Sequence, residues 1–261
     1  MTGVCLTTPR PASAARSIAA RGIVWAGISA RTVVPVRALL IANVVDADGG
    51  FIAERFRARG YSFTECLRES LGDWPALGDH ELIVTLGSEW SVYWPHVAES
   101  VAAETEMIKA AHHSGVPIYG ICYGNQIMAH ALGGTVERAR QPEIGWHHVV
   151  SDVPDVITEG PWMQWLHDVV TVPPNAQELA RSAVGPQAWR LDRSFCTQFH
   201  PEATETMIRR WAKSDGGGAE LLKYGIKPDE LVEQTRRNVA DSQPAAEHLV
   251  DWFVDRVVGS G

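Results

Sequence analysis

The stretch VPIYGICYGNQIMAHALGG, Val116 to Gly134, decides the fold. Its first half is an apolar run with the length and composition of a buried strand. Its second half has the spacing of a helix, which ends at the closing pair of glycines. The change occurs at Cys122, between Gly120 and Gly124. The stretch therefore predicts a strand that turns directly into a helix, with a thiol at the corner.

Outward from this corner, short apolar runs and helical periodicities alternate along the chain. Strands are expected at 37–46, 61–67, 81–87 and 116–122, and helices at 51–60, 97–114 and 123–134. After Gly134 the segments are shorter and more antiparallel in character, until a helix follows at 203–213. This order predicts an α/β fold: an open, mostly parallel sheet with helices on both faces and ligand sites at the carboxyl ends of its strands.

Composition narrows the class of protein. The chain has 261 residues, of which 45% are hydrophobic and 21% charged, and a net charge of −8. This charge disfavours nucleic acid or an anionic membrane surface as a partner. The apolar runs are too short to span a bilayer. The four cysteines form neither a CxxC motif nor a regular spacing, so we expect free thiols in a reducing cytoplasm.

The two ends of the chain differ in composition from the middle. Residues 1–36 contain four arginines and no acidic residue, which predicts a disordered leader or a mis-assigned start; a transit or signal peptide is the alternative. The segment SDGGGAE, which begins at Ser214, is expected to be a linker. Residues 214–261 are expected to form a C-terminal helical extension, with one helix on each side of Pro244. We expect this extension to cover the core, or to offer a surface for a partner.

The corner cysteine has the surroundings of a nucleophile. Gly120-Ile121-Cys122-Tyr123-Gly124 has the form of a nucleophile elbow with sulfur in place of oxygen. A helix N-terminus behind the thiol favours the thiolate. The segment QFHPE supplies a base, His200, and an orienting carboxylate, Glu202. The backbone amides of Tyr123, Gly87 and Ser88 are the expected oxyanion donors.

The motifs PIYGICYGNQIMAHALGG, PEIGW, QAWRLD and TQFHPE, in this order, resemble class I (triad) glutamine amidotransferases. In particular they resemble stand-alone proteins similar to the glutaminase domain of GMP synthase. The resemblance covers residues 37–213 and implies a flavodoxin-like fold. It also implies that Cys122 forms a γ-glutamyl thioester, that His200 is the base, that Glu202 orients it, and that Gln126 contacts bound glutamine.

Two departures from the family pattern concern the pocket. Ser88 replaces the second glycine of the family's oxyanion turn, which matters if this position requires a positive φ. Leu166 stands where the family often has a histidine, and His167 follows it. The far wall of the glutamine pocket is therefore open to question.

The resemblance implies a glutaminase that releases glutamate and ammonia. The sequence has no ATP-binding motif, so a separate ammonia-accepting synthetase is the expected partner, and no metal or other cofactor is expected. Three alternatives stay open: a γ-glutamyl peptidase or hydrolase acting on γ-glutamyl conjugates, an acyltransferase, and a catalytically silent regulatory subunit. The acceptor, the partner and the oligomeric state are not determined by the sequence.

Overall fold

The computed structural model of the protein describes residues 1–3 and 35–259. Nearly all of the leader expected at 1–36 lies outside the described residues, and a compact unit begins at Pro35. The strands are β1 (Val36–Ala42), β2 (Tyr61–Leu67), β3 (Leu82–Thr85), β4 (Ile118–Ile121), β5 (Thr135–His147), β6 (Val150–Ser151), β7 (Trp162–Thr171), β8 (Gln177–Arg181), β9 (Pro186–Leu191) and β10 (Ser194–Thr197). The helices are α1 (Gly50–Ala58), α2 (Ala98–His113), α3 (Tyr123–Ala131), α4 (Glu205–Lys213), α5 (Asp215–Lys223) and α6 (Pro228–Phe253).

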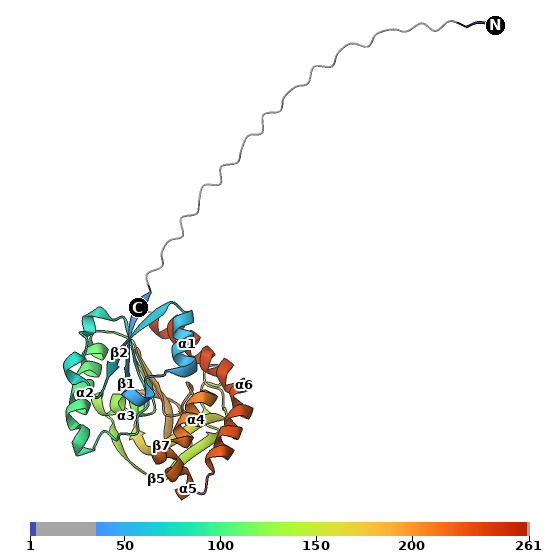
Figure 1. Ribbon diagram of the computed structural model, residues 1–261. Coiled ribbons are helices and arrows are strands. Elements are labelled where there is room, and N and C mark those ends of the chain that lie inside the picture. Colours follow the sequence, from blue (N-terminus) through green and yellow to red (C-terminus); the bar gives the residue numbers. More distant parts are fainter. Residues whose placement is uncertain (4–34, 260–261) are drawn as a thin grey trace. The chain divides into compact units, whose positions relative to one another are not determined.

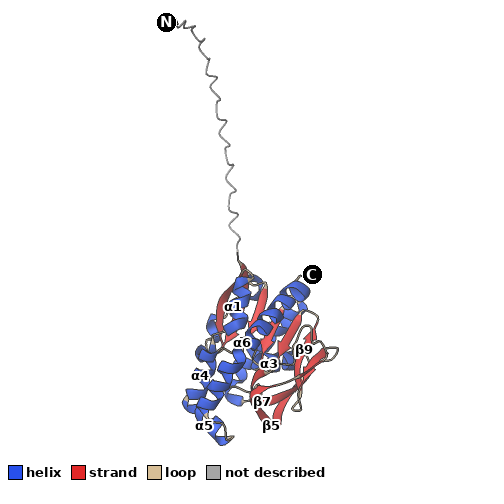
Figure 2. Cartoon of the chain, turned by 90° about the vertical axis from the view of Figure 1, so that its right-hand side faces the viewer, coloured by secondary structure: helices blue, strands red, loops and turns tan. Residues whose placement is uncertain are grey.

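Eight of the strands in the described chain form one sheet, in the order β2-β1-β3-β4-β10-β9-β8-β6. The strands from β2 to β10 are parallel, while β9, β8 and β6 continue the sheet in antiparallel pairings. Strands β5 and β7 pair with each other in a separate antiparallel ribbon, labelled in Figure 2. The expected open, mostly parallel sheet is confirmed. The antiparallel strands expected after Gly134 partly extend this sheet and partly form the separate ribbon.

Helices cover both faces of the sheet because side chains of each buried strand alternate between two cores. On β1, Leu40 packs in one cluster with Phe56 of α1 and Phe253 of α6. Its neighbour Leu39 packs in a second cluster with Ile108 of α2. In Figure 1, α1 and α6 accordingly lie on one side of the strands, and α2 lies on the other. Strands buried on both faces require this continuous apolar sequence.

The C-terminal segment differs from the expectation in two respects. The expected linker SDGGGAE lies at the start of helix α5, where the side chain of Ser214 accepts a hydrogen bond from the Gly217 amide at 3.1 Å. The cap satisfies an amide that the helix start leaves free, and Leu221 is buried. The two helices expected around Pro244 are one continuous helix, α6, with this proline in its interior.

Packing explains why α6 continues through Pro244. A proline removes one backbone hydrogen bond and crowds the preceding turn. Leu231 before the proline and Leu249 after it are both buried, although in different clusters of the core. Burial of these apolar side chains on both sides of Pro244 outweighs the local cost of the proline.

Among the described residues, none of the helices has the length and apolar character that crossing a membrane requires.

Candidate active site

Cys122 lies at a corner that only its glycine neighbours permit. Its backbone has φ 53° and ψ −104°, and it is the N-cap residue of α3, directly after β4. A Cβ atom on Gly124 would lie 2.2 Å from the carbonyl oxygen of Thr85, and one on Gly120 would lie 2.4 Å from Met128 Sδ. The glycines therefore allow α3 to pack against the ends of β3 and β4, while the cysteine itself takes the strained conformation.

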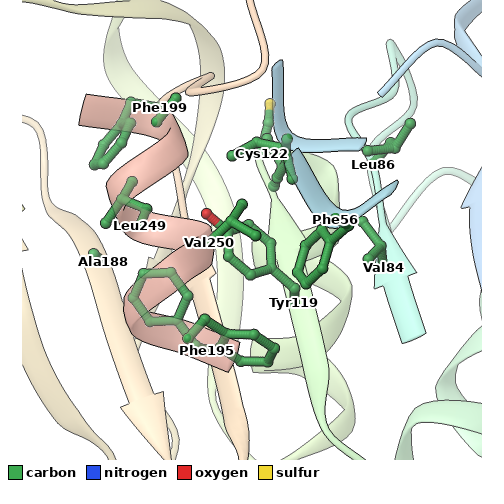
Figure 3. Packing of buried hydrophobic residues seen from close by; sticks show 14 of the residues in the cluster. Phe56, Val84, Leu86, Tyr119, Cys122, Ala188, Phe195, Phe199, Leu249 and Val250 are labelled. Carbon is green, nitrogen blue, oxygen red and sulfur yellow. The ribbon is translucent and has the colours of Figure 1, made fainter. Parts of the chain in front are cut away.

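The thiol of Cys122 differs from the other described cysteines in its surroundings. Figure 3 shows its side chain at one end of the buried apolar cluster, with Phe56 and Tyr119 beyond it. Burial raises the pKa of Cys66 to about 12 and also raises the pKa of Cys196 well above its usual range. Those two thiols are therefore protonated and unreactive at neutral pH. Cys122 has polar partners instead.

His200 and Glu202 follow β10 and are held close together. His200 Nδ1 lies 2.7 Å from Glu202 Oε1, and both side chains are almost fully buried. The His200 amide donates to the Met163 carbonyl of β7 at 2.8 Å, which fixes the backbone of this segment. Burial lowers the pKa of His200, but the adjacent Glu202 carboxylate and Cys122 thiol outweigh burial and raise the pKa well above its usual value.

The turn after β3 meets both of these groups. A Cβ atom on Gly87 would lie 3.1 Å from His200 Cε1 and 3.6 Å from Cys122 Cβ. Cys122, His200, Glu202 and Gly87 are therefore brought to one place, although they come from three separate segments of the chain. His200 Nε2 is buried and has no hydrogen-bond partner within the described chain, so this nitrogen is free to exchange a proton with the thiol or with a substrate.

Ser88 does not need the conformation that would favour glycine. In the described residues, the non-glycine residues with positive φ are Thr2, Cys122, Asn175 and Asp192. Across the same residues, the amides of Gly87, Ser88 and Tyr123 have no hydrogen-bond acceptor. Gly87 lies beside Cys122 and Tyr123 follows it, so these free backbone amides, with that of Ser88, are candidate donors to an oxyanion.

Gln126 lies one turn into α3, and its backbone amide donates to the Cys122 carbonyl at 3.1 Å. Its side chain is 4% exposed, and its Oε1 atom has no partner within the described chain. A buried acceptor without a partner carries a desolvation cost, which a hydrogen bond from a bound ligand would remove.

The region around the site matches a known protein family. Residues 95–210 match the sequence model of the family described as "Glutamine amidotransferase class-I". The chain contains a class-I glutamine amidotransferase domain. The matched residues of this domain include Cys122, Gln126, His200 and Glu202, whereas Gly87 and Ser88 precede them.

Individual proteins with sequences similar to this amidotransferase domain include glutamine-hydrolyzing GMP synthases. The chain is 31% identical over 238 residues to a GMP synthase (glutamine-hydrolyzing) from Aeropyrum pernix, covering 83% of this chain and 44% of that protein. It is 34% identical over 161 residues to the GMP synthase (glutamine-hydrolyzing) of Aquifex aeolicus, covering 53% and 30%. The chain thus spans less than half the length of these curated relatives.

A solved structure extends the similarity to the fold. A crystal structure of a glutamine amidotransferase from Thermotoga maritima superposes with a TM-score of 0.75, at 27% identity, over 84% of this chain and 98% of that one. A glutamine amidotransferase from Methylobacillus flagellatus, at 23% identity and a TM-score of 0.70, shares the fold over 86% of this chain and 95% of that one. The similarity in fold therefore extends well beyond residues 95–210.

The amidotransferase domain also has residues beside Cys122 and His200 that were not among the predicted site residues. Gln198, within the quoted TQFHPE motif, donates from Nε2 to Cys122 Sγ at 3.6 Å. The carbonyl of Trp165 on β7 lies 4.0 Å from the same sulfur. The Trp211 ring of α4 packs edge-on against His200, with centroids 5.1 Å apart. The position of Gln198 within a recognised motif could have indicated its place at the site. No local pattern indicates that β7 and α4 lie beside Cys122 and His200, because only the folded structure brings them together.

Strand β7 forms a wall beside the thiol. Leu166, at the position where the resemblance leads us to expect a histidine, is buried. On the opposite face of the strand, Trp165 Nε1 donates to Glu220 of α5 at 2.7 Å, and His167 Nε2 lies 2.6 Å from the other oxygen of that carboxylate. The pKa of the Glu220 carboxylate is lowered, mainly because of its hydrogen bond with His167. In this amidotransferase domain, the wall beside the thiol is thus held by a helix of the C-terminal segment.

Proposed function

We propose that the amidotransferase domain is an active, cysteine-dependent glutaminase. Cys122 Sγ attacks the side-chain carbonyl carbon of glutamine, and His200 Nε2 protonates the departing ammonia. The γ-glutamyl thioester is then hydrolysed by water that His200 deprotonates. Glu202 keeps His200 oriented and stabilises its charged form. The observation that carries this proposal is the free, buried Nε2 of a histidine that is paired with a carboxylate and lies beside a strained cysteine.

The remaining site groups have roles in the same scheme. The free amides of Gly87, Ser88 and Tyr123 are proposed to bind the oxyanion of the tetrahedral intermediate. Gln198 donates to the sulfur and is proposed to hold it in place for the attack. Gln126 presents an unpaired acceptor and is proposed to contact the substrate's polar groups. Each group thus acts on a different charge or proton of the reaction.

We further propose that the ammonia is used by a synthetase partner in the cytoplasm. The support for a partner is the similarity to glutamine-hydrolyzing GMP synthases, of which the chain matches 30% to 44%. The support for a reducing compartment is that the described cysteines, Cys66, Cys122 and Cys196, are all free thiols.

The test is ammonia release by the purified protein, alone and with added candidate synthetases. Wild type should release ammonia from glutamine, and Cys122→Ala should lose at least about 1,000-fold in rate and all labelling by a glutamine-mimicking electrophile. The same substitution at another buried cysteine, Cys196→Ala, is the control. Labelling that persists in Cys122→Ala would reject the assignment.

The γ-glutamyl hydrolase alternative is distinguished by the substrate in the same assay. Release of an amine from γ-glutamyl conjugates, without ammonia release from glutamine, would support this alternative and contradict the glutaminase.

A further inference from the structure

A buried arginine that takes no direct part in this reaction lies behind the candidate oxyanion turn. Arg68 directly follows β2 and is 1% exposed. Its Nε donates to Glu104 Oε2 of α2 at 2.8 Å, and Nη1 donates to Asn43 Oδ1 at 2.9 Å. The ion pair with Glu104 lies entirely within the protein, where the side chains of both partners have no exposed surface.

The same guanidinium holds two consecutive backbone carbonyls of the turn. Nη2 donates to the Leu86 carbonyl at 3.0 Å, and Nη1 donates to the Gly87 carbonyl at 3.2 Å. In a planar trans peptide the C=O and the following N–H point in opposite directions. The amides of Gly87 and Ser88 are therefore turned away from Arg68. These are two of the amides that have no acceptor within the described residues.

The guanidinium also contacts the residue that carries the third amide. Its central carbon lies 4.6 Å from the ring centroid of Tyr123, the residue after the nucleophile. A planar group with five donors can face several acceptors and a ring at once, which a lysine cannot do. Arg68 thus touches the segments that supply all three candidate oxyanion donors.

We propose that Arg68 is the positioning residue of the oxyanion hole, holding the Leu86 and Gly87 carbonyls so that the Gly87 and Ser88 amides face the thiol. This proposal rests on the proposed function, because it assumes an oxyanion next to Cys122. Glu104 has the accompanying role of neutralising and orienting the buried guanidinium, with Thr85 Oγ1 donating to the same carboxylate at 2.6 Å. Stability alone does not explain this arrangement, because apolar side chains of similar volume often replace a buried ion pair without loss.

The decisive variant is Arg68→Lys, which retains a cation for Glu104 but removes the fork that reaches both carbonyls. We expect kcat for glutamine to fall about 10- to 100-fold with KM changed less than about threefold, since an oxyanion is present only after attack. Alkylation of Cys122 by iodoacetamide forms no oxyanion, so its rate should stay within about twofold of wild type. Order parameters of the Gly87 and Ser88 amides, measured by nitrogen-15 relaxation, should fall from about 0.85 towards 0.6.

Two further variants guard against a loss of folding. Arg68→Met/Glu104→Gln removes both charges and preserves volume, and it should show the same loss of kcat and of amide order. Leu179→Ala, in β8 away from the site, creates a comparable packing defect and should leave kcat and both order parameters unchanged. Wild-type kcat and rigid amides in Arg68→Lys would overturn the proposal, as would failure of both Arg68 variants to fold, which would indicate a purely structural role.

Failure of the proposed function gives a different result. In that case wild type releases no ammonia and is not labelled by a glutamine-mimicking electrophile, whereas the order parameters still report whether Arg68 holds the turn. Loss of amide order in Arg68→Lys would then support the proposal that Arg68 orders the turn, and would overturn the proposal that this order serves catalysis.

Discussion

The residues at the site act through contacts with their neighbours rather than alone. Cys122 takes a positive φ that places it at the start of α3, and His200 obtains its raised pKa from Glu202 and Cys122 against the opposing effect of burial. The imidazolium is the form of His200 that these two neighbours favour. The pH range over which this form persists therefore depends on the Glu202 carboxylate.

Replacing Glu202 by glutamine tests this dependence. Without the carboxylate the pKa of His200 falls, so the imidazolium loses its proton at a lower pH and Cys122 loses a neighbouring positive charge. We expect the pH profile of iodoacetamide alkylation to show a rate for Cys122 in Glu202→Gln that is about 3- to 10-fold slower at pH 7.

The matched control is Glu205→Gln, the same change at a glutamate of α4 whose partners are Arg209 and Arg236. It should leave the alkylation profile in place. A profile that is identical in wild type and Glu202→Gln would show that Glu202 does not govern the charge on His200.

At the scale of elements, the junctions between strand and helix define the site. The β4–α3 corner, the turn after β3 and the segment after β10 meet at the carboxyl ends of parallel strands, as expected for open α/β sheets. Helix α1 joins them from the other face, because Gly50 lies so close to the Glu202 carbonyl that a Cβ atom would be 1.9 Å away. Close backbone approach at these junctions sets the distances between the candidate catalytic groups.

A methyl group at Gly124 should disturb this approach. In Gly124→Ala the new Cβ would lie 2.2 Å from the Thr85 carbonyl oxygen, so α3 must move away from β3. We expect the free energy of unfolding, measured by urea denaturation, to fall by about 1–3 kcal/mol, and electrophile labelling of Cys122 to be largely lost. Gly72→Ala, where a Cβ would have no atom within 4 Å, should match wild type in both measurements. Equal behaviour of the two variants would contradict the tight corner.

At the scale of the whole molecule, the C-terminal helix is part of the core. Phe253 of α6 is fully buried and packs edge-on against Phe56 of α1 and Tyr119 of β4, with ring centroids 6.1 and 5.2 Å apart. Arg55 and Arg59 of α1 pair with Asp251 of α6 at the edge of this contact. The sequence-based boundary at 213/214 is a prediction that a core variant of α6 can test.

We expect Phe253→Ala to lower the free energy of unfolding by about 3–5 kcal/mol, because it leaves a cavity among aromatic rings. Leu222→Ala removes a comparable apolar side chain that is 63% exposed, and it should change the free energy by less than about 0.5 kcal/mol. Urea denaturation followed by circular dichroism gives both values. A Phe253→Ala transition in which only α6 melts, with the sheet intact, would instead support a separable extension.

Local patterns in the sequence were sufficient for the strand and helix order up to α3, for the corner at Cys122 and for the His200–Glu202 segment. Each depends on periodicity, glycines or short spacing, which act over a few residues. The continuity of α6 through Pro244 and the helical form of SDGGGAE were predicted wrongly, because burial against distant strands outweighed the local signals of proline and glycine.

The sequence by itself therefore determined the fold class and the corner at which Cys122 lies, because both follow from local conformation and residue type. Only the tertiary structure decided what surrounds the thiol: the Arg68 guanidinium behind the turn, the Gln198 donor to the sulfur, and the β7 wall held by Glu220. The physical reason is that these contacts join segments as far as 76 residues apart. Their geometry depends on how the whole sheet and its helices pack together.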